Sequence, residues 1–364
     1  MTGAPAFFLP SLAGGGAERV VVDLVNGLTR RGLAVELVLG DHSGPLVDRV
    51  DDDVTVVDLG VRRASRVVPR LAGWMARRRP RAVVSALEHT NVAALVAGAA
   101  ARTRVVPSVH NMVSPLFSSP HRGTRAAAWA ATAAYRRAAE VVAVSAAVGD
   151  DLVASMGVDP RRIRVVPNPV DAARVQRLAR DGEDRSGDRA RPRLVALGRL
   201  ERVKGFDLLL PAWARVRATR GGHLTIFGEG SERAALERQA AELQLGDDAL
   251  TFAGFDDNPW PTVAASDGLV VSSRDEGFGL TLVEAMALGI PVATTCGDGA
   301  PGEIVDRGRF GEVATTGSVA SLADAMLRLV DAPRPPGELV ARARRWSPDR
   351  AMQTWAELLG LTAA

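Results

Sequence analysis

The sequence lacks the features of disulfide-bonded secreted proteins and of membrane-spanning proteins. Cys296 is the only cysteine in 364 residues, which excludes an intrachain disulfide and fits a reducing compartment. No run of 18 or more residues is apolar enough to span a bilayer. Residues 1–10 also lack the basic segment that opens a signal peptide. These absences predict a cytoplasmic protein.

Lysine is nearly absent too, which draws attention to one loop. Of the 45 basic residues only Lys204 is a lysine, so the other 44 are arginines. The isoelectric point is near 9.8, but a net charge of +3 is too small for this length to indicate nucleic-acid binding. Lys204 lies in a loop after an apolar strand, and we expect it to contact a phosphate. The alternative is an ordinary solvated loop.

The sequence does contain a regular alternation of strand and helix patterns, with a hydrophobic fraction of 47%. This alternation predicts the α/β class, with parallel strands in doubly wound sheets. Strands are predicted at residues 6–9, 34–39, 54–59, 82–85, 105–109, 141–144, from 163, 194–198, 223–227, 250–255, 269–272 and 290–293. Helices include residues 17–29, 65–78, 124–138, 206–219 and 346–359, and one that Ser231 caps and that reaches Leu243.

The length of the chain suits two domains. A polar, glycine-bearing stretch at residues 172–193 is typical of a linker. It separates an N-terminal domain, residues 1–171, from a C-terminal domain, residues 194–345. Ligands of open α/β sheets bind beside the carboxyl ends of the strands, so we expect a cleft between the two halves to hold the ligand.

The most informative stretch is residues 272–287, where a strand is followed by a glycine-bearing loop and a helix. Residues 279–281 would form the helix N-terminus, whose unpaired N–H groups and positive dipole suit a phosphate. Glu276 lies in the loop, and Glu284 lies about one turn into the helix. A carboxylate beside a phosphate suits a hydroxyl-rich group such as ribose. The stretch therefore indicates a sugar–diphosphate–nucleoside ligand.

Two other loops carry residues suited to phosphate. Arg199 and Lys204 flank the loop after the strand at 194–198, and together they could neutralise a diphosphate leaving group. Gly15 and Gly16 follow a strand and open a helix, so their N–H groups could approach a phosphate closely. A solvated loop and a plain tight turn are the respective alternatives.

Histidine and metal-binding patterns give weaker signals. His110 ends a strand and could bond a sugar hydroxyl, although a lone histidine there is more often structural. His89 has the same placement and competes with it. No zinc spacing, Ser/His/Asp order or Asp-x-Asp pair stands out, so no metal and no cofactor is expected.

The ordered set of motifs resembles family 4 of the retaining glycosyltransferases, which have the GT-B architecture of two Rossmann-like domains. The segment from Glu276 to Glu284 is similar to the Glu-x7-Glu signature of that family. Further motifs agree in order along nearly the whole chain, at residues 15–19, 144–145, 166–171, 198–206, 227–230 and 301–305. The resemblance implies domains that face each other across a cleft and a last helix, within residues 346–364, that crosses back to the N-terminal domain.

The resemblance also implies a role for each candidate residue. Glu276 would bond the hydroxyls of the donor sugar, His110 would touch that sugar near C6, and Glu284 would bond the ribose hydroxyls. The diphosphate would be held by charged side chains and by backbone N–H groups from both domains. This set comprises Arg199, Lys204, Gly279, Leu280, Thr281, Gly15 and Gly16.

The implied reaction moves a hexose or N-acetylhexosamine from a nucleotide-diphosphate sugar, expected to be a UDP-sugar, to a hydroxyl acceptor with retention. Glu276 resembles a glycosidase nucleophile, but the family makes it a sugar ligand. Arg199 and Lys204 would replace a divalent cation. The acceptor would be a lipid-linked or cell-surface glycan. The alternatives are a soluble natural-product acceptor, a UDP-sugar epimerase and a non-catalytic nucleotide-sugar-binding subunit.

A dense group of arginines in the N-terminal domain raises the question of membrane contact. Leu71, Trp74 and Met75 lie between Arg62, Arg63, Arg66, Arg70, Arg77, Arg78, Arg79 and Arg81. An amphipathic basic surface of this kind would rest on anionic lipid at the inner face of the cell membrane and bring the enzyme to its acceptor. The alternative is a solvated helix in an arginine-rich protein.

Overall fold

A computed structural model describes residues 3–61, 64–180 and 191–361, and the chain divides into two compact units. The first unit is Met1–Pro169 with Pro348–Ala364, and the second is Val170–Ser347. The predicted linker at residues 172–193 is not irregular throughout. Its first part forms helix α7 (Ala172–Leu178), whereas residues 181–190 lie outside the described residues.

The described residues of the first unit form a seven-stranded sheet in the order β3-β2-β1-β4-β5-β6-β7, with every neighbouring pair parallel. The strands are β1 (Ala6–Leu9), β2 (Glu36–Leu39), β3 (Thr55–Asp58), β4 (Val83–Ala86), β5 (Val105–Val109), β6 (Val141–Ala143) and β7 (Ile163–Val165). All four residues of β1 are apolar and buried, because this strand lies inside the sheet. The predicted parallel α/β arrangement is confirmed.

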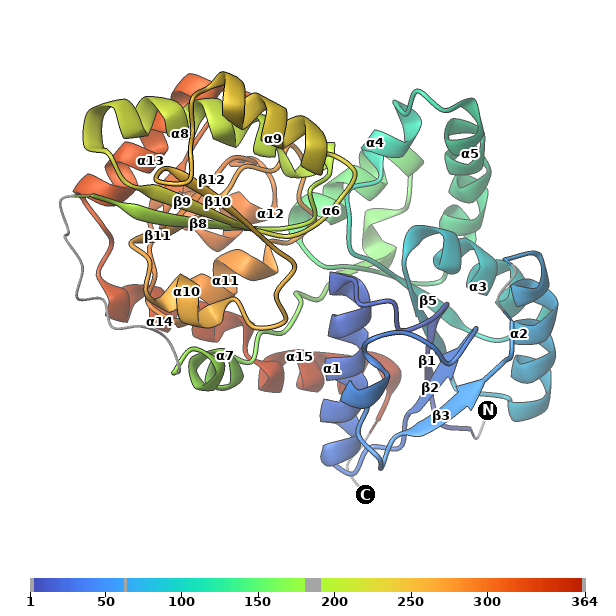
Figure 1. The fold of residues 1–364 in the computed structure, drawn as a ribbon. Helices are drawn as coiled ribbons and strands as arrows, with labels where there is room; N and C mark the ends of the chain where they lie inside the picture. The colour runs from blue at the N-terminus through green and yellow to red at the C-terminus, as the bar shows by residue number, and fades with distance from the viewer. Residues whose placement is uncertain (1–2, 62–63, 181–190, 362–364) are drawn as a thin grey trace. The chain divides into compact units, whose positions relative to one another are not determined.

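Helices cover both faces of this sheet (Figure 1). They are α1 (Gly16–Arg30), α2 (Ala64–Arg78), α3 (Glu88–Ala101), α4 (Ser114–Phe117), α5 (Arg122–Arg137), α6 (Ala146–Asp151) and the C-terminal α15 (Pro348–Leu359). Shorter helical turns are η1 (Val47–Arg49), η2 (Leu152–Met156) and η3 (Pro160–Arg162).

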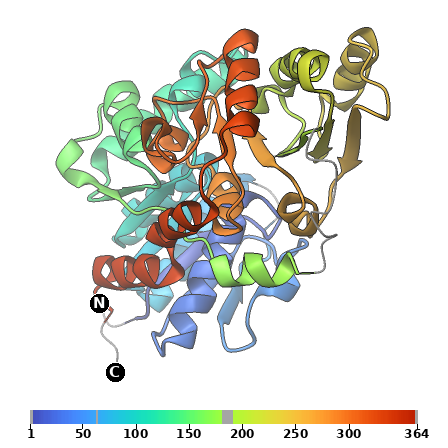
Figure 2. The same cartoon turned by 90° about the vertical axis from the view of Figure 1, so that its left-hand side faces the viewer.

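The C-terminal helix α15 returns to the first unit, as predicted (Figure 2). The ring of Trp355 packs edge-on against Phe7 of β1, with 5.7 Å between ring centroids. Asp349 forms an ion pair with Arg31 at the end of α1. Gly360, with φ of 62°, follows the helix, which agrees with a glycine stop.

The second unit has a six-stranded sheet within the described residues, in the order β10-β9-β8-β11-β12-β13, and it is also parallel. The strands are β8 (Arg193–Leu197), β9 (His223–Phe227), β10 (Leu250–Gly254), β11 (Gly268–Val271), β12 (Val292–Thr294) and β13 (Glu312–Val313). The buried Trp213 anchors the core, and its indole N–H donates to Ala249 O at 2.9 Å.

Figure 1 shows α8, α9 and α13 on one face of the second sheet and α10, α11 and α14 on the other. The helices are α8 (Phe206–Arg220), α9 (Arg233–Glu242), α10 (Trp260–Ala264), α11 (Leu280–Ala287), α12 (Ala300–Ile304), α13 (Val319–Asp331) and α14 (Pro336–Ala343). Helical turns lie at η4 (Arg202–Lys204), η5 (Asp306–Gly308) and η6 (Arg344–Trp346).

One predicted helix cap is wrong. Ser231 does not cap α9, whose N-cap position is Glu232 and lacks a side-chain cap. The Ser231 hydroxyl instead donates to the Glu201 carboxylate at 2.8 Å, and its backbone N–H donates to the same carboxylate at 3.2 Å. A hydrogen bond from the serine hydroxyl to a carboxylate is stronger than one from a backbone N–H to the serine hydroxyl. The contact with Glu201 therefore takes the place of the cap.

The predicted amphipathic arginine surface is also wrong in its apolar part. Leu71, Trp74 and Met75 are buried in the core of the first unit, where α2 packs on α3, so they form no apolar surface. The described arginines of this segment do have exposed side chains; they are Arg66, Arg70, Arg77, Arg78, Arg79 and Arg81. Arg62 and Arg63 lie outside the described residues.

Candidate functional site

The candidate site lies at the carboxyl ends of β8 and β11, which are neighbours in the second sheet. The chain order reverses at this pair, because β9 and β10 lie on one side and β12 and β13 on the other. Ligands of open α/β sheets bind outside the strand ends at such a reversal point. The loops 198–205 and 272–279 leave these two strands, so the two predicted stretches meet at one edge of the sheet.

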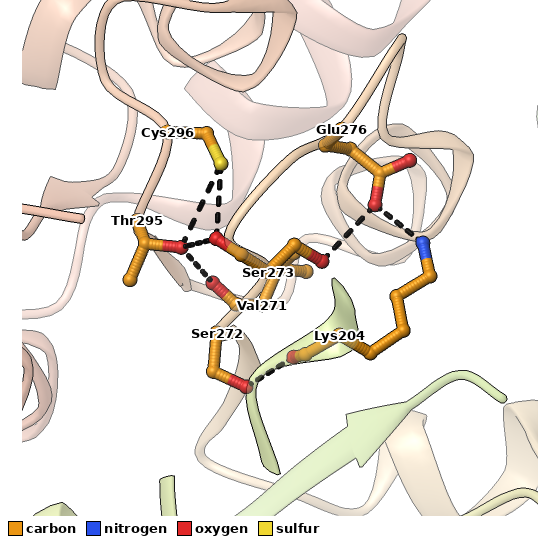
Figure 3. Close-up of polar contacts among 7 residues, drawn as sticks. All are labelled: Lys204, Val271, Ser272, Ser273, Glu276, Thr295 and Cys296. Carbon is orange, nitrogen blue, oxygen red and sulfur yellow. Dashed lines mark hydrogen bonds and ion pairs between the residues drawn. The ribbon is translucent and has the colours of Figure 1, made fainter. Parts of the chain in front are cut away.

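Lys204 and Glu276 come from these two loops and form an ion pair, with Lys204 Nζ 2.6 Å from Glu276 Oε2 (Figure 3). Their side chains are only 24% and 18% exposed, so solvent screens this pair less than a surface pair. The hydroxyl of Ser273 donates to the same Oε2 atom at 3.2 Å. The sequence predicted both charges at this edge of the sheet but not their mutual contact.

The loop that carries Lys204 is held against the end of β11. The hydroxyl of Ser272 donates to the backbone carbonyl of Lys204 at 2.8 Å. Gly205 follows with φ of 67°, and a Cβ there would lie 2.1 Å from the Ser272 carbonyl oxygen. Only glycine permits this close approach of the two backbones. Gly205 therefore allows the lysine to lie beside the Glu276 loop.

Helix α11 begins at the end of the second loop. Gly279, with φ of 106°, is the N-cap residue, and no side chain caps the helix there. The first N–H groups of a helix have no acceptor within it, and they carry the positive end of the helix dipole. Glu284 lies in the second turn of α11 and is only 5% exposed. Leu280 and Thr281 occupy the first turn, so the predicted phosphate-binding terminus has the expected local structure.

Arg199 lies on the first loop with an exposed side chain. Leu200 N–H bonds the Glu229 carbonyl at 2.9 Å, and a Cβ on Gly228 would lie 1.9 Å from Gly198 O, so the β8 and β9 loops lie close together. No ion pair joins Arg199 to Glu276 in the described part of the chain. Its predicted phosphate contact stays a prediction.

Sequence reasoning missed a second ion pair, which joins the loop at residues 272–279 to helix α8. The Arg274 guanidinium binds both oxygens of Asp207, in the first turn of α8, at 2.6 and 2.7 Å. It also donates to Arg202 O at 2.8 Å, and the Arg274 N–H donates to Val203 O at 2.8 Å. Burial opposes ionisation of Asp207, but its bonds to Arg274 and the charge of that residue leave the pKa of the carboxyl below its usual value. Only the place of Arg274 inside the motif hinted at this contact.

In the first unit, the predicted glycine loop forms the N-terminus of α1. Gly15 is the N-cap residue, and Gly14 before it has φ of 94°. A Cβ on Gly15 would lie 2.3 Å from an oxygen of the buried Glu18 carboxylate. The absence of a side chain at Gly15 thus leaves room for the carboxylate of Glu18, a residue that sequence reasoning did not single out. The phosphate contact of Gly15 and Gly16 stays a prediction.

His110 directly follows β5. The Ser108 hydroxyl lies 3.1 Å from its Nε2 atom, and its Nδ1 atom is buried without a hydrogen-bond partner among the described residues. Burial disfavours the imidazolium ion and lowers the pKa of His110 to about 4. His89, the competing histidine, has an exposed side chain in the first turn of α3. His110 thus presents a neutral imidazole at neutral pH.

The lowered pKa of His110 predicts a specific dependence of stability on pH. Between pH 6.5 and about 4 the unfolded chain takes up a proton at this histidine and the folded chain does not. The stability that the folded protein has from a neutral His110 is therefore complete above pH 6.5 and is lost as the pH falls toward 4. NMR titration of the imidazole measures this pKa directly. A titration midpoint near 6.5 would contradict the lowered pKa. In His110→Gln, the free energy of unfolding should no longer fall between pH 6.5 and about 4 on account of this residue.

The described residues hold neither a cluster of potential metal ligands nor a membrane-spanning helix. No group of three or more His, Cys, Asp or Glu side chains placed to hold a metal ion occurs among residues 3–61, 64–180 and 191–361. None of the helices within those ranges is long and apolar enough to cross a membrane.

Two family models match the two units. The model described as Glycosyltransferase Family 4 matches residues 14–174, and the one described as Glycosyl transferases group 1 matches residues 191–332. The Anabaena protein Alr3699/HepE, solved in complex with UDP, shares 21% identity, covering 98% of this chain and 99% of its own, with a TM-score of 0.79. At this identity, the structural likeness establishes the fold.

Three curated relatives have sequences similar to this chain. The lipopolysaccharide core biosynthesis glycosyltransferase LpsE of Rhizobium meliloti is 28% identical over 87% of this chain and 86% of its own length. The MMP alpha-(1->4)-mannosyltransferase of Mycolicibacterium hassiacum is 30% identical over 63% of this chain. The 2-deoxystreptamine glucosyltransferase of Streptomyces kanamyceticus is 33% identical over 59%. The matches span only 54% and 57% of the last two relatives.

Proposed function

The chain belongs to family 4 of the glycosyltransferases and has their GT-B fold, and from this we propose a specific reaction. The protein transfers a hexose or N-acetylhexosamine from a nucleotide-diphosphate sugar, with UDP as the expected nucleotide, to a hydroxyl acceptor. The configuration at the anomeric carbon is retained, and no divalent metal is needed.

The observation that carries this proposal is the Lys204–Glu276 ion pair, at 2.6 Å, in which Glu276 belongs to the loop that leads into the N-terminus of α11. A lysine and an open helix terminus together suit a diphosphate. A partly buried carboxylate in the same loop suits the hydroxyls of an attached sugar. The buried Glu284, one turn into α11, is proposed to bond the ribose at the other end of the diphosphate.

The remaining roles follow from this orientation of the donor. Arg199 and the N–H groups of Gly279, Leu280 and Thr281 are proposed to bind the diphosphate oxygens together with Lys204. From the first unit, the N–H groups of Gly15 and Gly16 are proposed to bind the same phosphates. His110, as a neutral imidazole, is proposed to bond the donor sugar near C6.

The proposed reaction needs positive charge where the leaving group forms. The bond between the anomeric carbon and the phosphate oxygen breaks, and the nucleoside diphosphate leaves with the electron pair. The acceptor oxygen bonds the anomeric carbon from the same face and passes its proton to the departing phosphate oxygen. Lys204 and Arg199 stabilise the charge that develops on the diphosphate, a task that a divalent cation performs in other enzymes.

We propose that the acceptor is a lipid-linked or cell-surface glycan. The relative LpsE, which aligns with 87% of this chain, is a lipopolysaccharide core biosynthesis glycosyltransferase by name, and this supports an acceptor of this class. The name of the 2-deoxystreptamine glucosyltransferase supports the second candidate, a soluble natural-product acceptor. Activity on a lipid-linked glycan but not on aminocyclitols would decide for the first candidate, and the reverse result would decide for the second.

Peripheral contact with an anionic membrane is proposed through the exposed arginines at residues 66–81, without help from the buried apolar residues of that segment. Contact through arginine alone should weaken steeply with salt. Flotation with anionic vesicles at low salt tests it. Failure of the protein to float would remove the membrane contact and leave the transferase proposal intact.

A panel of UDP-, GDP- and ADP-sugars tests the proposed reaction. Nucleoside diphosphate release that requires an acceptor and persists in EDTA is the expected result, and NMR of the product should show the anomeric configuration of the donor. Conversion of the sugar without any acceptor would indicate an epimerase instead. Nucleotide binding without hydrolysis or transfer would indicate a non-catalytic binding subunit.

A further inference from the structure

The Glu276 carboxylate is held from one side only. Its two donors among the described residues, Lys204 Nζ and the Ser273 hydroxyl, bond the same oxygen, Oε2, at 2.6 and 3.2 Å. Figure 3 shows the second oxygen of Glu276 directed away from both donors. One carboxylate oxygen is thus occupied within the protein, while the other is available to a hydroxyl of a bound sugar.

Ser273 is itself fixed by the neighbouring strand. Its carbonyl oxygen accepts a hydrogen bond from the Thr295 hydroxyl and another from the Cys296 thiol, with Sγ 2.9 Å away (Figure 3). Both residues follow β12, which pairs with β11 in parallel register. Ser273 and Thr295 are each 1% exposed, so water does not compete for these bonds.

These contacts form a continuous connection from β12 to the carboxylate. Thr295 holds the Ser273 backbone, and the Ser273 side chain holds Glu276 Oε2. Without the serine hydroxyl, the carboxylate would keep only Lys204 and could rotate about its side-chain torsions toward the ammonium group. Groups that orient a ligand-binding residue without touching the ligand commonly change activity by about 10- to 100-fold when they are removed.

We propose that Ser273 and Thr295 are positioning residues for Glu276, which hold its second carboxylate oxygen ready for a hydroxyl of the donor sugar. This inference rests on the proposed function, because it assumes that Glu276 binds the transferred sugar. Neither residue is expected to touch the donor. Their effect is therefore on how the sugar is held and not on how the nucleotide binds.

The chain offers a matched control for Thr295. Thr294 is the adjacent residue at the end of β12, is fully buried, and has a hydroxyl without a hydrogen-bond partner among the described residues. Replacing either threonine by the isosteric valine removes one buried hydroxyl. Only Thr295→Val removes a hydrogen bond to Ser273.

The test compares Ser273→Ala, Thr295→Val and Thr294→Val. We expect Ser273→Ala and Thr295→Val each to lower kcat about 10-fold or more, with the Kd for UDP within about 2-fold of wild type. Thr294→Val should keep wild-type kcat, and the conservative Ser273→Thr and Thr295→Ser should restore most of the lost activity. Unchanged kcat in both test variants, an equal loss in Thr294→Val, or a parallel loss of UDP affinity would overturn the proposal.

A second readout separates this proposal from the proposed function. The ratio of the Kd values for UDP and for the intact donor measures the contribution of the sugar to binding and needs no turnover. This contribution should fall in Ser273→Ala and Thr295→Val but not in Thr294→Val. If the wild-type protein binds donor without transferring it, the proposed function fails. Separately, if the ratio of Kd values in Ser273→Ala and Thr295→Val equals that of wild type, the positioning role of these residues is refuted.

Discussion

Replacement of Glu276 by alanine is expected to lower kcat/KM by roughly 100-fold or more, about 2.7 kcal/mol of transition-state stabilisation. The variant loses the carboxylate proposed to bind the transferred sugar. It also leaves the partly buried Lys204 without the anion that lies 2.6 Å from its Nζ atom. Initial rates across donor concentrations, with the favoured donor from the sugar panel, give the measurement.

Two further variants show whether this loss comes from the carboxylate at this position. Glu276→Gln keeps the shape but loses the charge, so it should also be strongly impaired. Glu237→Ala removes an exposed glutamate on α9 that is paired with Arg233 and should retain wild-type activity. Normal turnover of Glu276→Ala would remove this residue from the site.

Replacement of Lys204 by alanine should cause a loss of similar size, roughly 100-fold or more in kcat/KM. The variant lacks the ammonium group proposed to stabilise the charge on the departing diphosphate. Unlike the Ser273 and Thr295 variants, it should also bind UDP more weakly, because the nucleotide itself carries that diphosphate. Steady-state kinetics together with calorimetric titration of UDP separate the two effects.

Arg202→Ala is the control for Lys204. Arg202 is an exposed cation two residues earlier in η4, so its loss changes the local charge equally but leaves the Lys204–Glu276 pair in place. We expect its kcat/KM to stay within about 3-fold of wild type.

Because Lys204 is the only lysine, an amine-directed reagent can modify only this side chain besides the α-amino group. Bound UDP should slow that modification, and wild-type turnover of Lys204→Ala would contradict its role.

The fold was largely predictable because the spacing of apolar residues along a strand reflects the position of that strand in the sheet. β1 and β11 are short apolar runs between glycine-bearing loops, and a strand buried on both faces requires that composition. The same rule places residues 198–205 and 272–279 at one edge, since parallel neighbours end there. The proximity of Lys204 and Glu276 therefore follows from strand order, although their direct contact does not.

The failures concern side chains with several possible partners. Ser231 had the spacing of a helix cap, but the Glu201 carboxylate, thirty residues away in sequence, binds it instead. Leu71, Trp74 and Met75 fit both an exposed amphipathic face and a core face, because periodicity shows a stripe but not what covers it. The same limit hid the Arg274–Asp207 pair, since a charged residue in a loop and another in the first turn of a helix are each typical of solvated positions.

Binding of nucleoside diphosphates to the wild-type protein tests the central claim most directly. Calorimetric titration with UDP, GDP and ADP in EDTA measures whether the loops after β8 and β11 form a diphosphate site that needs no metal. We predict saturable binding of one of these nucleotides, expected to be UDP, with affinity reduced by Lys204→Ala. Binding of none of the three at millimolar concentration would contradict the claim.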